Sequence, residues 1–166
     1  MNGNKRKSLT ITGAGDIIMN LDFKPEVLSK EYVKENGVLY DDNVFYSENE
    51  EWLALLDKTP ELGGKPFTGL LYELYMNGIP RYYEYYREGF ADGEYVTFYD
   101  NGAVASYCIM KGFAYVGDAY EWHRNGKLKR FDKKDGKGIK LKTVCFDTDG
   151  NITYLMEKGK VIINKG

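Results

Sequence analysis

The sequence has very few of the residues from which metal sites and disulfide frameworks are built. It contains two cysteines, Cys108 and Cys145, and a single histidine, His123. The cysteines are far apart, no C-x-x-C pair occurs, and no histidine neighbours either cysteine. Neither a disulfide framework nor a zinc site is therefore indicated. We expect a reducing compartment, no metal and no cofactor.

Long apolar runs are also absent. No stretch approaches the roughly 18 consecutive apolar residues that would suggest a membrane-spanning helix. The basic start, MNGNKRK, is similar to that of a signal peptide, but Asp16 and several glycines and threonines interrupt the segment that would have to be apolar. The sequence therefore predicts a cytoplasmic protein without a membrane-inserted segment.

Motifs for catalysis are equally scarce. His123 occupies a position that other copies of the repeat described below fill with tyrosine, which favours an aromatic structural role over metal binding or acid–base chemistry. The segment TGAGD, residues 12–16, lacks the third glycine and the Lys-Ser/Thr pair of phosphate-binding loops. Asp147 and Asp149 flank a turn, where paired carboxylates are usually turn formers. We predict that the protein is not an enzyme.

The charge is nearly balanced overall but unevenly distributed. The 166 residues carry 23 Lys or Arg against 25 Asp or Glu, which excludes a nucleic-acid binder driven by bulk charge. Residues 26–61, however, carry ten acidic side chains against three lysines, whereas residues 124–142 carry nine basic side chains against two aspartates. The length suggests a single domain, and the charge distribution gives it one acidic and one basic pole.

A repeat of 24 residues organises the C-terminal part of the chain. Three columns of residues keep this spacing, or come within one residue of it. The first comprises Asn77-Gly78, Asn101-Gly102, Asn125-Gly126 and Asp149-Gly150; the second Gly69, Gly93, Gly117 and Leu141; the third Gly89, Gly112, Gly136 and Gly159.

Each repeat is predicted to be a β-hairpin. Asn-Gly and Asp-Gly supply the positive φ angles of a two-residue type I′ turn, and the third glycine begins the connection to the next hairpin. The two apolar columns before the turn are two residues apart, so their side chains point to the same face of the strand. The two columns after the turn are three residues apart, so they can share that face only if the second strand contains a bulge or a bend. The columns are Tyr72, Val96, Tyr120 and Val144; Leu74, Phe98, Trp122 and Phe146; Pro80, Val104, Leu128 and Ile152; and Tyr83, Tyr107, Phe131 and Leu155.

The fold class follows from stacking these hairpins. We expect a mostly all-β protein, an elongated twisted antiparallel sheet of four hairpin repeats over residues 65–166, preceded by a helix-containing cap, or a divergent repeat, over residues 1–64. Within the cap, residues 35–46 are predicted to form a hairpin. Residues 47–58 are predicted to form a short helix after a capping-box-like start.

The stretch from Lys65 to Phe131 resembles the MORN-like repeats of the YwqK-type antitoxin family. The most specific match is PFTG, residues 66–69, followed by YELYMNG, residues 72–78. The resemblance implies an immunity protein or antitoxin that binds a cognate toxin protein, often a nuclease or deaminase, and blocks it without catalysis. The runner-up hypothesis is a MORN-type scaffold that uses the basic residues 124–142 to bind a membrane or a protein. Sugar binding is a weaker third hypothesis, because the chain has only two tryptophans.

The tyrosine-rich stretch RYYEYYR, residues 81–87, is the main candidate for partner binding. Strand alternation turns Tyr83 inward and places Tyr82, Glu84 and Tyr86 on the other face, where tyrosines either pack on aromatic neighbours or form a recognition surface. The candidate contacts are Tyr82, Glu84, Tyr86, Tyr75, Tyr99, Asp41, Asp42, Glu48, Glu50 and Glu51. The acidic members are either a solvated rim or steer association with the positively charged active site of a nucleic-acid-targeting toxin.

Overall fold

The structure, a computed structural model, describes residues 8–10, 18–20, 23–40, 44–46 and 54–165. Its elements are β1 (Ser8–Thr10), β2 (Ile18–Asn20), α1 (Lys30–Asn36), β3 (Gly37–Leu39), β4 (Phe45–Tyr46), β5 (Leu55–Leu56), the 3-10 helix η1 (Pro60–Leu62), β6 (Gly69–Leu74), β7 (Pro80–Arg87), β8 (Phe90–Phe98), β9 (Val104–Lys111), β10 (Ala114–Trp122), β11 (Leu128–Lys134), β12 (Lys140–Phe146), β13 (Ile152–Glu157) and β14 (Lys160–Asn164).

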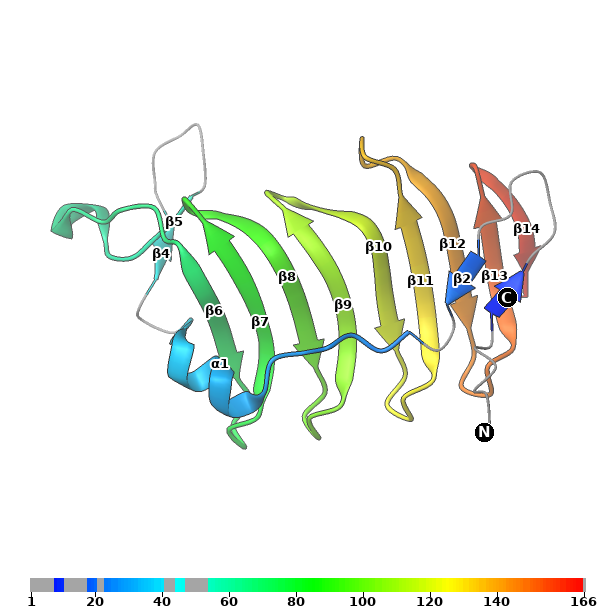
Figure 1. Cartoon of the computed structure of the whole chain (residues 1–166), viewed down its shortest axis with the longest axis horizontal. Helices are drawn as coiled ribbons and strands as arrows, with labels where there is room; N and C mark the ends of the chain where they lie inside the picture. Colours follow the sequence, from blue (N-terminus) through cyan, green and yellow to red (C-terminus); the bar gives the residue numbers. More distant parts are fainter. Residues whose placement is uncertain (1–7, 11–17, 21–22, 41–43, 47–53, 166) are drawn as a thin grey trace, which may run out of the picture.

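One ten-stranded sheet dominates the described part of the chain. Strands β6 to β14 follow one another in sequence order and pair antiparallel, and β3 extends the sheet by pairing in parallel with β6. Figure 1 shows these strands side by side along the long axis of the molecule. The predicted all-β class, with hairpins joined into one elongated sheet, is confirmed.

The loops of the repeat hairpins differ from the predicted type I′ turns. In the first, the N–H of Gly78 donates to the carbonyl of Tyr75 at 2.8 Å, and Gly78 has a φ of 75°. The loop thus has three residues, in the pattern of a type I turn followed by a left-handed glycine. Asn77 does not take a positive φ; its Oδ1 accepts from the N–H of Ile79, and its Nδ2 donates to the carbonyl of Asp100 in the next hairpin. The same backbone bonds close the next three hairpin loops, and we call this edge of the sheet the loop edge.

Two-residue turns occur instead at the opposite edge. Glu88-Gly89 and Lys158-Gly159 have positive φ at both residues and join directly paired strand ends, as type I′ turns do. Among the described non-glycine residues, only Glu88 and Lys158 have positive φ. The third glycine column therefore closes turns between repeats, except that Gly138 takes the positive φ in the third copy, where Gly136 does not.

The predicted bulge is confirmed in the second strand of every repeat. In β7 the pairing with β6 skips Arg81, between Pro80 and Tyr82. The extra residue turns Pro80 to the same side as Tyr83, and both are buried, whereas Arg81 is exposed. The register shifts in the same way in the other three hairpins, at Ala105, Lys129 and Thr153.

The predicted apolar columns form the core on one side of the sheet, which we call the core face. Its buried members include Tyr72, Tyr83, Val96, Phe98, Tyr120, Trp122, Leu128, Phe131, Val144, Phe146 and Leu155. Of the two columns that precede the loops, only Leu74 is not fully buried. The alternation of the strands thus places large side chains of four hairpins in two connected clusters that share Val104 and Tyr107.

A segment upstream of the repeats crosses this face. Residues 23–29, which we call the strap, run across β10, β9, β8 and β7 to reach α1 (Figure 1). Phe23 stacks on Tyr120 with ring centroids 4.3 Å apart, and the N–H of Leu28 donates to the hydroxyl of Tyr83 at 3.2 Å. The strap therefore covers apolar surface that the hairpins alone would leave in water.

The opposite side of the sheet, which we call the reverse face, carries Glu84, Cys108 and Asp132 among its side chains. It is covered only near β6 by described residues, where a third apolar cluster forms from Val44, Leu55, Phe67 and Leu71, with Val38, Tyr40 and Tyr86 packed against it.

Two predictions for the cap were wrong. Residues 35–46 do not form a hairpin, because β3 pairs in parallel with β6, while β4 pairs with β5. Leu55 and Leu56 form a strand rather than the end of a helix, because they pair with β4, and both side chains are buried. Residues 47–53 lie outside the described part. The helix of the cap is α1 instead, where Ser29 accepts from the N–H of Tyr32 and Val33 is fully buried.

Candidate protein-binding surface

Tyr75 and Tyr99, two of the predicted contacts, connect consecutive repeats. The hydroxyl of Tyr75 donates to the carbonyl of Phe98 at 2.9 Å, and that of Tyr99 donates to the carbonyl of Trp122 at 2.7 Å. His123 repeats the contact, with Nε2 2.9 Å from the carbonyl of Phe146. The structural role expected for His123 thus extends to both tyrosines, whose hydroxyls are already engaged.

The predicted contacts of β7 lie together on the reverse face, as strand alternation indicated. Glu84 is buried, and burial raises the pKa of its carboxyl; the Tyr86 hydroxyl donates to it at 3.0 Å. Tyr86 also packs on Phe67 in the third apolar cluster. Tyr82 is half-buried and is the member of this group that faces a hollow. The structure therefore places Glu84 and Tyr86 mainly in packing, whereas Tyr82 borders a groove.

A shallow groove of about 410 Å³ lies beside Tyr82. Tyr95 forms its other aromatic wall, with the two rings edge to face at 5.9 Å between centroids. Burial raises the pKa of both hydroxyls, so both phenols remain neutral donors at physiological pH. At the rim, Arg81 pairs with Glu73 at 3.0 Å. This combination of neutral phenols and a charged rim is typical of protein-recognition surfaces.

Sequence reasoning missed Tyr95. It stands opposite Glu84 on one neighbouring strand and opposite Cys108 on the other, so it belongs to the reverse face at the centre of this surface. The available signal was the repeat itself, since Tyr95 precedes the core column residue Val96 and must therefore face away from the core.

A polar cluster on the reverse face was also missed. Asp132 is buried and accepts from Thr143 and from the Arg130 guanidinium, the latter at 2.8 Å. Tyr115 also donates to it, and burial together with that carboxylate raises the pKa of Tyr115 to about 12. The ammonium of Lys134 lies 3.4 Å from the centroid of the Tyr115 ring. These contacts satisfy a buried carboxylate and hold the two strands β11 and β12 together.

The five acidic candidates, Asp41, Asp42, Glu48, Glu50 and Glu51, lie outside the described residues.

The basic residues 124–142 do not form a free cationic patch. Five of the nine side chains pair with carboxylates of the repeats, and Lys142 is buried. The pairs are Arg124–Asp100, Lys129–Glu121, Arg130–Asp132, Lys133–Asp118 and Lys140–Asp132. Local neutralisation of this kind argues against the membrane-binding form of the scaffold hypothesis, which needs unpaired cations for an anionic surface.

The described residues also offer little for chemistry. They contain no group of three or more His, Cys, Asp or Glu side chains that could hold a metal ion. Burial raises the pKa of the Cys108 thiol to about 11, which keeps it protonated and unreactive. Among the helices that the structure describes, none is long and apolar enough to cross a membrane.

The described residues thus form a sheet of β-hairpin repeats with a tyrosine-lined groove on its reverse face. In a comparison with known proteins, the chain is 44% identical over 61 residues to the protein named immunity protein YwqK from Bacillus subtilis (strain 168). The similar segment is 37% of this chain and 38% of that protein. The resemblance to YwqK-type immunity proteins is thereby confirmed over part of the chain. No protein-family model and no solved structure matches the chain.

Proposed function

We propose that the protein is a cytoplasmic immunity protein that binds a protein toxin and blocks it by covering its active site. The observation that carries this proposal is the 44% identity to a protein named as an immunity protein, over more than a third of the chain. The scarcity of catalytic motifs in the sequence is in keeping with inhibition by binding alone. Binding needs no covalent step and no cofactor.

The groove between Tyr82 and Tyr95 is the surface that we assign to this contact. It lies on the reverse face near the loop edge, where the aromatic rings are half-buried and present both apolar area and hydroxyl donors. A stable complex buries roughly 1,600 Å² in total, so a toxin would extend from this groove over neighbouring loops or strands.

We further propose that the toxin acts on nucleic acid, because of the acidic sequence of residues 26–61. Ten carboxylates against three lysines in this segment would attract the positively charged active site of such an enzyme. The association rate should then fall steeply as the salt concentration rises, while the rate of dissociation changes little.

Co-expression with the product of the neighbouring gene tests the function. The full chain should restore growth of cells that this product inhibits, and the purified proteins should form a complex. Replacing both groove tyrosines, Tyr82→Ala and Tyr95→Ala, should weaken the complex at least about tenfold, since central aromatic residues carry much of the binding energy. The matched control is Tyr154→Ala, further along the reverse face on β13. A neighbouring product that is neither toxic nor bound would contradict the proposal.

A further inference from the structure

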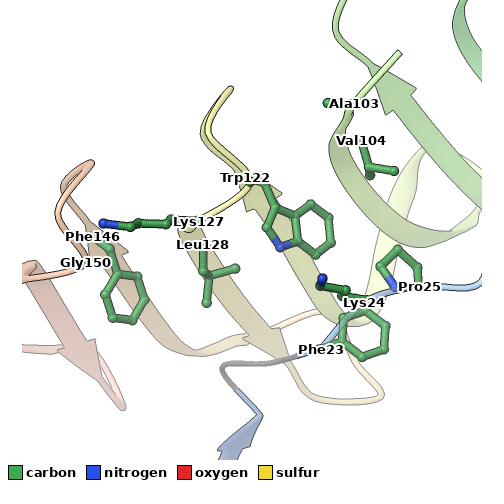
Figure 2. Close-up of a pocket in the computed structure, with 11 residues that line it drawn as sticks. Phe23, Lys24, Pro25, Ala103, Val104, Trp122, Lys127, Leu128, Phe146 and Gly150 are labelled. Carbon is green, nitrogen blue, oxygen red and sulfur yellow. The ribbon is translucent and has the colours of Figure 1, made fainter. Parts of the chain in front are cut away.

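A second, deeper hollow lies on the core face at the loop edge. Its volume is about 600 Å³, and its floor is formed by the edges of three largely buried core side chains, Trp122, Leu128 and Phe146 (Figure 2). Phe23 and Pro25 of the strap form one wall. The remaining lining residues come from the hairpin loops and from the start of β9: Ala103, Val104, Gly126, Lys127 and Gly150. The strap thus covers the core face only in part, and this pocket remains beside the core side chains at the loop edge.

The charged residues of the pocket are both cationic. Lys24 and Lys127 line it, whereas no described carboxylate does. In Figure 2 the Lys24 side chain lies between the strap and Trp122, and Lys127 extends over the opposite end. Neither ammonium has an ion pair with a described residue, although Lys127 donates to the backbone carbonyl of Asp149 at 3.2 Å. The nearby acid Asp100 is occupied by Arg124 at 2.7 Å.

We propose that this pocket holds an acidic, apolar segment of the toxin, in which an aromatic or aliphatic side chain enters the pocket and a neighbouring carboxylate pairs with Lys24 or Lys127. The inference rests on the proposed function and adds a second, chemically defined contact. Buried aromatic and aliphatic anchors in preformed pockets are the usual centres of binding energy in protein interfaces. The two ammonium groups, which form no ion pair with a described residue, favour an acidic neighbour over a basic one.

A single hairpin loop lies between the pocket and the tyrosine groove. Tyr99 and Ala105 line the groove, while Ala103 and Val104 line the pocket, so the β8–β9 loop separates the two hollows. A toxin seated over the loop edge would therefore reach both, one from each side of this loop.

The test uses the full chain and the neighbouring-gene toxin. Ala103→Trp fills the pocket from its mouth, and the double variant Lys24→Glu with Lys127→Glu reverses its charge. We expect each to raise the Kd at least about tenfold, or about 1.4 kcal/mol, while thermal unfolding stays close to that of the wild type. The matched control is Lys137→Glu with Lys160→Glu, which makes the same charge change at exposed sites away from the pocket.

A second measurement does not depend on the variants. The indole N–H resonance of Trp122 should shift when the toxin binds the wild-type chain; Trp52→Phe identifies that resonance. If the wild type binds while this resonance stays in place and both pocket variants bind normally, the pocket inference is wrong and the immunity function stands. If the wild type does not bind the toxin, the immunity function itself fails, and the inference fails with it.

Discussion

The hydroxyl of Tyr99 donates to the backbone carbonyl of Trp122, 2.7 Å away and 23 residues further along the chain. Tyr75 makes the same contact to Phe98, and His123 makes it to Phe146. The guanidinium of Arg124 lies 4.8 Å from the centroid of the Tyr99 ring, above a side chain that is fixed at both ends. A column that looks like a row of exposed aromatics in the sequence thus connects each hairpin to the next.

Removing one of these hydroxyls should weaken the sheet measurably. Tyr99→Phe keeps the ring under Arg124 but leaves the Trp122 carbonyl without its donor, and we expect a loss of about 1 kcal/mol in the free energy of unfolding. Urea unfolding followed by circular dichroism measures this. Tyr154→Phe is the matched control, with an expected change near zero, because no hydrogen bond to a described residue involves the Tyr154 hydroxyl. Equal effects of the two substitutions would contradict the connecting role of Tyr99.

The sheet could be predicted from the repeat, because the alternation of large apolar side chains along a strand indicates which face of the strand is buried. The parity change after the loop even indicated the bulge that skips Arg81. Loop length was mispredicted, since Asn-Gly suits both two-residue and three-residue loops. In the observed loop the side chain of Asn77 accepts from the N–H of Ile79 and donates to the carbonyl of Asp100 in the next hairpin. The strap carries no periodic signal, because its packed residues, Phe23, Val27 and Leu28, contact strands far away in sequence.

The candidate surface was predicted less completely than the sheet. Alternation correctly put Tyr82, Glu84 and Tyr86 on one face, but exposure on that face depends on what covers it. Phe67 comes from the irregular segment before β6 and packs on Tyr86, a contact that a single sequence does not reveal. Nor does the sequence reveal the pocket beside Trp122, because it forms where the strap stops covering the core.

Two glycines of the repeat should respond oppositely to alanine. Gly93 has a φ of 144°, and a Cβ there would lie 2.9 Å from the Cβ of Tyr85, so Gly93→Ala should destabilise the protein by about 1–3 kcal/mol. Gly136 has no positive φ and open space around its Cα, so Gly136→Ala should be neutral or stabilise by up to about 1 kcal/mol. Differential scanning calorimetry of both variants gives the comparison. A melting temperature lowered equally in both would show that these two backbone conformations are not as described.

Truncating the strap should destabilise the core face. Phe23 contacts Tyr120, Trp122 and Tyr107, yet it is only half-buried, so Phe23→Ala should cost about 1–3 kcal/mol rather than the larger loss of a fully buried phenylalanine. Trp122 should at the same time become more exposed. In a Trp52→Phe background, its fluorescence should shift to longer wavelength. Glu26→Ala, at an exposed position of the strap outside the pocket, is the control for both readouts. A similar shift in that variant would contradict a specific role of the Phe23 ring.

Glu84 should make stability depend on pH in the direction opposite to most carboxylates. Burial raises the pKa of its carboxyl in the folded state, so the folded chain holds this proton more tightly than the unfolded chain does. The Glu84 carboxyl therefore stabilises the fold most at pH values below its pKa in the unfolded chain. This stabilisation is lost as the pH rises through its pKa in the folded chain. Glu84→Gln removes this loss and can still accept from Tyr86. The variant should gain stability over the wild type at pH 7 and lose that advantage near pH 4.

Asp100 supplies the opposite case for comparison. Its hydrogen bond with Arg124 lowers the pKa of its carboxyl, so its contribution is present at neutral pH and is lost as the pH falls through the folded value. Asp100→Asn should therefore be slightly less stable than the wild type at pH 7, and the difference should shrink as the pH falls below the ordinary pKa of an aspartate. Thermal unfolding of the wild type and both variants across pH 3 to 8 measures both differences. The two carboxyls have similar chemistry and differ mainly in burial. If the stability difference from the wild type changed with pH in the same direction for both variants, Glu84 would be solvated and the reverse face would be more open than described.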